Sequence, residues 1–197
     1  MSFYDVRLKV MRHELGHWLM SRHVGFRAGD IEITIYRDDQ KGGKHQYRQE
    51  GSSMVYTAPV VNNVDDLKEY LENRFQVLYA GIAAQIHGQK LSPEESGRIM
   101  EMDAANDLRI IRELAPMLRG ILYGPEQTPE ITEEQIYELT VPIWERTLSQ
   151  IEELYPKIDG MSKILVPFIQ KHGAKYPFSV SLIEDTERHY DAAHPGS

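Results

Sequence analysis

Hydrophobic residues recur at helical spacing over residues 5–22, near the start of the chain. Asp5 is expected to cap this helix, and Gly25 is expected to end it in the left-handed conformation. The next stretch, "DIEITIYR", alternates isoleucine with other residues and predicts a half-buried strand. After a turn at "KGGK", the stretch "HQYRQEGSSMVYTAP" predicts one or two short strands around a break at Gly51. Together these strands indicate a small antiparallel sheet.

The rest of the chain carries helical patterns separated by loops. Small residues in "YAGIAAQIHG" would let a second helix approach closely, and Gly88 is expected to end that helix. Ser92 predicts the cap of a short helix. Thr132 and Gln135 predict a capping box for a longer helix. Pro142 is expected to kink this helix or to mark its first-turn boundary. The expected helices span residues 65–87, 103–122, 132–155, 159–172 and 181–190.

Composition narrows the class of protein. The hydrophobic fraction of 41% and the charged fraction of 26% are those of an ordinary globular domain, so we expect one core in the 197 residues. The net charge of −8 disfavours binding to nucleic acid or to an anionic membrane. No apolar run reaches the roughly 18 residues that a membrane span needs, and the N-terminus lacks the pattern of a signal peptide. We therefore expect a mainly helical α+β protein of the cytoplasm.

The first predicted helix contains "HELGH", which places His13 and His17 four residues apart on one face. Because the chain has no cysteine, any metal site must use His, Asp and Glu side chains. Two imidazoles at this spacing can bind one Zn²⁺ ion, which lowers the pKa of water to about 7. Glu14 lies beside the ligand pair and can accept a proton from that water. The motif therefore predicts a zinc site with Glu14 as general base.

Two observations support this interpretation. Gly16 costs about 1 kcal/mol relative to alanine inside a helix, which indicates close packing at that point. The strands that follow offer an edge to which an extended peptide can pair. The alternative is a structural helix with two histidines on its polar face. A third ligand must come from elsewhere in the chain, because His23 lies six residues beyond His17, just before the expected end of the helix, and is expected on the surface.

Five segments occur in an order that resembles the peptidase domain of FtsH-type ATP-dependent zinc proteases. They are "HELGHWL", "DIEITIYR", "MVYT", "VLYAGIAAQIHG" and "DAANDLRIIRELA". The resemblance implies a zincin-like fold in a single domain over residues 1–197, with the metal site and sheet in residues 1–122 and a C-terminal helical bundle in residues 130–191. It also implies that Asp107, in "AANDLRII", is the third zinc ligand beside His13 and His17.

The chain departs from that family in several places. Only 12 residues precede His13, so we expect a stand-alone domain without an ATPase module. Whether the domain works with a partner ATPase or as a homo-oligomer is left open by the sequence. Gln85 and Ile86 stand where the family has acids after paired alanines. The segment "MDA" replaces "TGA" and introduces Asp103, which offers either an acceptor for a ligand histidine or a competing ligand.

The leading prediction is a zinc metalloendopeptidase acting on peptides or on unfolded, flexible polypeptides. Its substrate would lie along an edge strand between residues 31 and 57. Two alternatives stay open. "HELGHWL" also resembles the zinc helix of ImmA/IrrE-type regulatory peptidases, and Glu101 with Ala104 to Asn106 partly mimics their third-ligand segment. The other alternative is a catalytically silent binding module that keeps the metal as a structural staple.

Overall fold

The computed structural model describes residues 2–39, 45–125 and 128–195. The fold is mainly helical with a small three-stranded antiparallel sheet, which confirms the predicted α+β class. Within the described residues, no helix is both long enough and apolar enough to cross a membrane. The elements in chain order are α1 (Phe3–His23), β1 (Arg27–Asp39), β2 (His45–Tyr56), α2 (Val64–Ile86), α3 (Pro93–Asp103), α4 (Ala105–Tyr123), α5 (Pro129–Leu165), the 3₁₀ turn η1 (Val166–Phe168), β3 (Lys175–Phe178) and α6 (Val180–Ala193).

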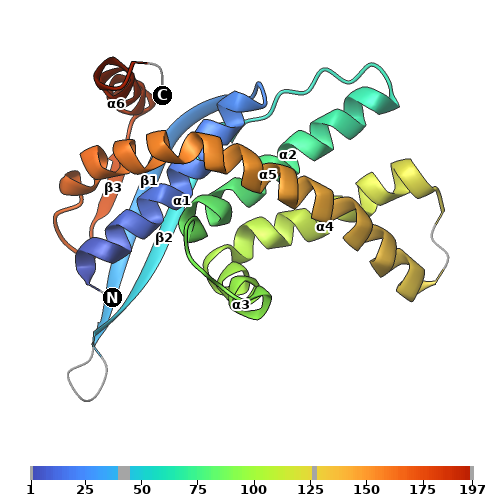
Figure 1. The fold of residues 1–197 in the computed structure, drawn as a ribbon, viewed down its shortest axis with the longest axis horizontal. Helices are drawn as coiled ribbons and strands as arrows, with labels where there is room; N and C mark the ends of the chain where they lie inside the picture. The colour runs from blue at the N-terminus through green and yellow to red at the C-terminus, as the bar shows by residue number, and fades with distance from the viewer. Residues whose placement is uncertain (1, 40–44, 126–127, 196–197) are drawn as a thin grey trace.

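Helix α1 lies between the β1–β2 hairpin and the long helix α5 (Figure 1). Its cap is Ser2, whose hydroxyl accepts a hydrogen bond from the backbone of Asp5 while the Asp5 carboxylate accepts one from the backbone of Ser2. The prediction of Asp5 as the cap is therefore wrong, because Asp5 is the third residue of a capping box. Gly25 has a φ of 84°, which confirms the predicted left-handed end.

The sheet has the strand order β2-β1-β3, so β2 and β3 are its edges. Ile31, Ile33 and Ile35 of β1 are fully buried, as their alternation predicted. Strand β2 runs unbroken from residue 45 to residue 56, so the predicted break at Gly51 is wrong. Strand β3 was not predicted; it pairs with β1 and brings the C-terminal region onto the sheet. The turn predicted at "KGGK" lies outside the described residues.

Helices α1 and α2 pack closely through small residues. A Cβ atom added at Gly16 would lie 2.9 Å from the Cβ atom of Ala84 and would also overlap the backbone of Ala80. The close approach predicted for both segments is confirmed. On the opposite side of α1, the fully buried Trp18 donates its indole N–H to the carbonyl of Gly29 at 3.0 Å. Helix α1 is thus fixed between α2 and the sheet.

Helix α5 covers the helix predicted at 132–155 and continues through the first part of the one predicted at 159–172, but it ends at Leu165, so the predicted extension to residue 172 is wrong. It begins at Pro129 with Thr128 as its cap, so the predicted capping box at Thr132 is wrong. Pro142 and Pro156 both lie inside it, so Pro142 does not mark its first-turn boundary. The helix packs on α1, α2 and α4 and contributes to two hydrophobic clusters, one around α1 and β1 and one between α2 and α4. The C-terminal region is therefore part of the same packed structure and not purely helical, since it contains β3.

Candidate metal centre

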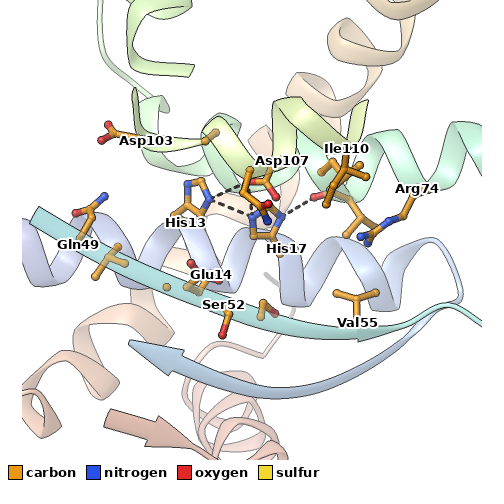
Figure 2. A pocket seen from close by; sticks show the side chains of 17 residues that line it. His13, Glu14, His17, Gln49, Ser52, Val55, Arg74, Asp103, Asp107 and Ile110 are labelled. Atoms are coloured by element: carbon orange, nitrogen blue, oxygen red, sulfur yellow. Dashed lines mark hydrogen bonds and ion pairs between the residues drawn. The ribbon is translucent and has the colours of Figure 1, made fainter. Parts of the chain in front are cut away.

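Helix α1 presents His13 and His17 one turn apart toward α2 and α4 (Figure 2). Their exposed fractions are only 6% and 7%. The rings fit because α2 carries a glycine where they approach it. A Cβ atom added at Gly81 would lie 2.6 Å from Cε1 of His17 and 2.7 Å from Nε2 of His13. Gly81 therefore leaves the space that the two imidazoles occupy.

Asp107 lies in the first turn of α4 and faces both histidines. Its Oδ2 atom is 3.4 Å from Nε2 of His13 and 3.4 Å from Nε2 of His17, and the two Nε2 atoms are 3.1 Å apart. Zinc bonds of 2.0–2.2 Å in a tetrahedral arrangement place ligand atoms roughly 3.3 Å from one another. The three donor atoms thus have the mutual spacing of a zinc site. Among the residues that the structure describes, they form one group able to hold a metal ion.

The hydrogen bonds of the two Nδ1 atoms show which ring nitrogens carry a proton and which face the space between His13, His17 and Asp107. Nδ1 of His17 lies 2.7 Å from the carbonyl oxygen of Val77, which can only accept, so this nitrogen carries the proton. Nδ1 of His13 lies 3.2 Å from Oε1 of Gln85 and donates to it. In the neutral rings both Nε2 atoms then carry lone pairs, directed at each other and at the Asp107 carboxylate. Acceptor atoms that converge in this way can bind a cation between them.

The pKa values of His17 and Asp107 in the metal-free protein also indicate a site that favours a positive charge. Burial lowers the pKa of His17, but the charge and hydrogen bond of Asp107, the charge of Glu14 and the Val77 carbonyl outweigh it and raise the pKa to about 9. Burial raises the pKa of Asp107, yet the nearby histidines hold that pKa well below its usual range. A proton on His17 therefore takes the place of a cation when no metal is bound.

Glu14 points away from the ligand pair, toward β2 (Figure 2). Its exposed fraction is 4%, and its carboxylate lies against Gly51, where an added Cβ atom would be 2.7 Å from Cδ of Glu14. Burial raises the pKa of the Glu14 carboxyl, and the Asp107 charge adds to the rise, whereas His13 and His17 oppose it. A raised pKa suits a general base that must both take up and release a proton near neutral pH.

A chain of polar contacts begins at Nδ1 of His13, on the side of the ring away from Asp107. Gln85 accepts from His13 and donates its amide N–H to Oδ2 of Asp103 at 2.7 Å. Lys9 completes the chain with its ammonium 2.7 Å from the same oxygen. Because the Asp103 carboxylate accepts from the Gln85 amide nitrogen, it directs the amide oxygen toward His13. Asp103 is thus neither a direct acceptor for a ligand histidine nor a member of the ligand cluster; it acts through Gln85.

The structure brings together all four residues singled out from the sequence: His13, Glu14, His17 and Asp107. Glu101, suggested by the second resemblance, is exposed on α3 and lies outside the cluster. Sequence reasoning missed the contributions of one helical stripe, although the spacing was visible: Arg74, Val77, Gly81 and Gln85 recur at intervals of three to four residues along the site-facing side of α2.

The site opens into a cavity of about 200 Å³ between α1, α4 and β2. Strand β2 lines one wall with Gln49, Gly51, Ser52, Ser53 and Val55. Arg74 and Leu78 of α2 and Ile110 of α4 also line the cavity. A second cavity of about 700 Å³ adjoins it at Gln49 and Asp103 and follows β2 back to Gln46. The candidate metal centre is therefore reached from a groove that runs beside strand β2.

Comparison with models of protein families finds none that matches this chain, and comparison with curated proteins finds no match either.

Proposed function

We propose that this protein is a zinc-dependent metallopeptidase, in which His13, His17 and Asp107 bind the ion and Glu14 is the general base. One observation carries the proposal. Three donor atoms from α1 and α4 converge at the spacing of zinc ligands, and the buried carboxylate of Glu14 lines the same cavity. A metal ion that only stabilises the fold needs the three donor atoms but not the buried carboxylate.

Zinc supplies Lewis acidity, which polarises a carbonyl group and lowers the pKa of water to about 7. The chain's own residues carry the rest. Glu14 accepts a proton from the attacking water and later gives it to the amine that leaves when the peptide bond breaks. The Val77 carbonyl and Gln85 keep the outer nitrogens of His17 and His13 protonated, so that the inner nitrogens stay available as ligands.

The groove favours an extended polypeptide as substrate. Strand β2 is an edge of the sheet, so its outer backbone groups are available to pair with a further strand. The two adjoining cavities follow β2 from Gln46 to Val55, a length of about 30 Å at the rise of a strand. A groove of that length accommodates several residues on both sides of a scissile bond, which is the requirement of an endopeptidase.

The position of Asp107 also supports the resemblance to FtsH-type peptidase domains over the ImmA/IrrE alternative. The first resemblance requires an acid at Asp107 near the histidines, and the second requires one at Glu101. A zincin-like identity and membership of the FtsH lineage remain part of the proposal.

Substitution of Glu14 by glutamine tests the proposal. Zinc-loaded protein should hydrolyse a fluorogenic casein substrate, and Glu14→Gln should reduce the rate by about a hundred- to ten-thousand-fold while retaining its zinc. Glu101→Gln, which changes an exposed glutamate on α3, is the matched control and should keep full activity. Equal hydrolysis by the wild type and Glu14→Gln would rule out the proposed role. If the zinc-loaded wild type hydrolyses no substrate, the result would favour the alternative of a catalytically silent binding module.

A further inference from the structure

Arg74 is a half-buried cation in the cavity wall for which the described part of the chain provides no ion pair. Other buried or partly buried arginines have protein partners. Arg12 bonds to Asp159, and Arg119 donates to Gln135 and to two backbone carbonyls. A charge that is partly removed from water usually has such a partner. Arg74 therefore stands out as a partly buried charge without an ion-pair partner among the described residues.

The sequence around Arg74 explains why it has no partner within its helix. The residues three and four positions away on either side are Tyr70, Leu71, Val77 and Leu78, which are all uncharged at neutral pH. The side chain instead points into the opening beside His17, with Ile110 of α4 on one side and Val55 of β2 on the other (Figure 2). These apolar neighbours strengthen any ion pair that forms there, because they exclude water.

We propose that Arg74 binds a carboxylate of the substrate, on the His17 side of the scissile bond. The proposal rests on the peptidase function and specifies its substrate class. A guanidinium binds a carboxylate through two parallel N–H···O bonds, which gives both strength and orientation. The carboxylate can belong to an Asp or Glu side chain or to a free C-terminus, since the two present the same group. The protein thereby selects acidic peptides locally, despite its net charge of −8.

The test uses peptides that carry Glu, Gln or Lys in turn at each position around the cleaved bond, each made with a free or an amidated C-terminus. The wild type should cleave the carboxylate-bearing peptide about ten- to a hundredfold faster, in kcat/KM, at one position on one side of the bond. Arg74→Gln should abolish this preference, Arg74→Glu should turn it toward Lys, and Arg74→Lys should keep part of it. Arg188→Gln, which removes an exposed arginine of α6, is the matched control and should preserve the preference.

A binding measurement separates this proposal from the peptidase function. Fluorescein-labelled versions of the same peptides are titrated with zinc-loaded Glu14→Gln protein, with and without the Arg74 substitutions, and followed by anisotropy. Arg74-dependent tight binding of carboxylate peptides, without hydrolysis by the wild type, would sustain the carboxylate site and reject the peptidase. Hydrolysis with no carboxylate preference, or a preference unchanged in Arg74→Gln and Arg74→Glu, would reject the site and leave the peptidase standing. Loss of the preference on C-terminal amidation identifies the terminus as the source, and its persistence identifies the side chain.

Discussion

Helix α1 meets two walls of the cleft that are built in different ways. On the α2 side, His13 and His17 are enclosed by Gly81 and fixed by polar contacts to Gln85 and to the Val77 carbonyl. On the β2 side, Glu14 rests on the backbone at Gly51, and no other strand of the described residues pairs with the outer edge of β2. Under the proposed function, the first wall holds the zinc ligands, whereas the second positions the general base and leaves room for a substrate.

Under the proposed function, metal binding and catalysis should therefore be separable by mutation, although His13 and the base Glu14 are consecutive residues. Each wall contains a glycine whose missing side chain makes space for a functional group. Alanine at either position adds the same single methyl group. The consequences should nevertheless differ, because the methyl group meets ligands on one wall and the base on the other.

The largest effect is expected for Gly81→Ala. The added methyl group would overlap the ligand nitrogens of both histidines, so the zinc dissociation constant should rise by about a hundredfold or more, and hydrolysis should be lost with the metal. Isothermal titration with zinc measures the change. Gly120→Ala on α4 is the matched control, since nothing lies near its added methyl group; it should bind zinc normally and gain about 0.5–1 kcal/mol of stability.

The substitution Gly51→Ala should instead separate the two properties. The methyl group would push against the Glu14 carboxylate, and a displacement of about 1 Å can reduce a catalysed rate by about a hundredfold. Zinc affinity should stay near the wild-type value. Parallel measurements of kcat/KM and zinc binding check this. If Gly51→Ala lost its zinc, or kept full activity, the division of labour between the walls would be wrong.

A smaller effect is expected for Gln85→Ala, which removes the partner of His13 and disconnects Asp103 from the site. Loss of a contact behind a metal ligand typically weakens metal binding by about ten- to a hundredfold. Gln89→Ala, one turn further along and bonded only to a backbone carbonyl, is the control. Zinc competition with a fluorescent chelator measures both variants, and equal affinities would argue against a positioning role for Gln85.

The smallest effect is a dependence on pH. In the metal-free protein His17 has a pKa raised from 6.5 to about 9, so its proton stabilises the fold fully below pH 6.5, and that contribution is lost as the pH rises through about 9. Asp107 has a lowered pKa, so its contribution is present above pH 3.8 and is lost as the pH falls further. The melting temperature of metal-free protein should therefore decline from pH 6.5 to 9.

Zinc binding should displace the proton of His17, so calorimetry in buffers of different ionisation enthalpy should detect release of about one proton per ion at pH 7. His17→Ala removes the group and provides the control for both measurements. A melting temperature that rose over this range, or zinc binding without proton release, would contradict the assigned protonation.

Local signals in the sequence predicted the elements well. The alternation of Ile31, Ile33 and Ile35 defined β1, and Gly25 and Gly88 both adopt the left-handed conformation expected of helix ends. The failures involve distant partners. Gly51 does not break β2, because its small size serves a contact with Glu14. Strand β3 contains Pro177 and only four residues, and its pairing with β1 could not be seen locally.

In the candidate site, too, local signals predicted some residues and missed those that depend on distant partners. The spacing of His13 and His17 on one helix predicted their shared direction, since it depends on local geometry alone. Asp107 was found only through the resemblance, because nothing local relates the start of α4 to α1. Gln85 was noted as a missing acid and its contact with His13 was not foreseen, and Arg74 was overlooked. Both lie on the stripe of α2 that contains Gly81.

Diffraction from zinc-soaked crystals, recorded at the zinc absorption edge, tests the central claim most directly. We expect one anomalous peak per chain, about 2.0–2.2 Å from Nε2 of His13, Nε2 of His17 and a carboxylate oxygen of Asp107. A peak bound elsewhere, or one that left Asp107 without contact to the ion, would contradict the account.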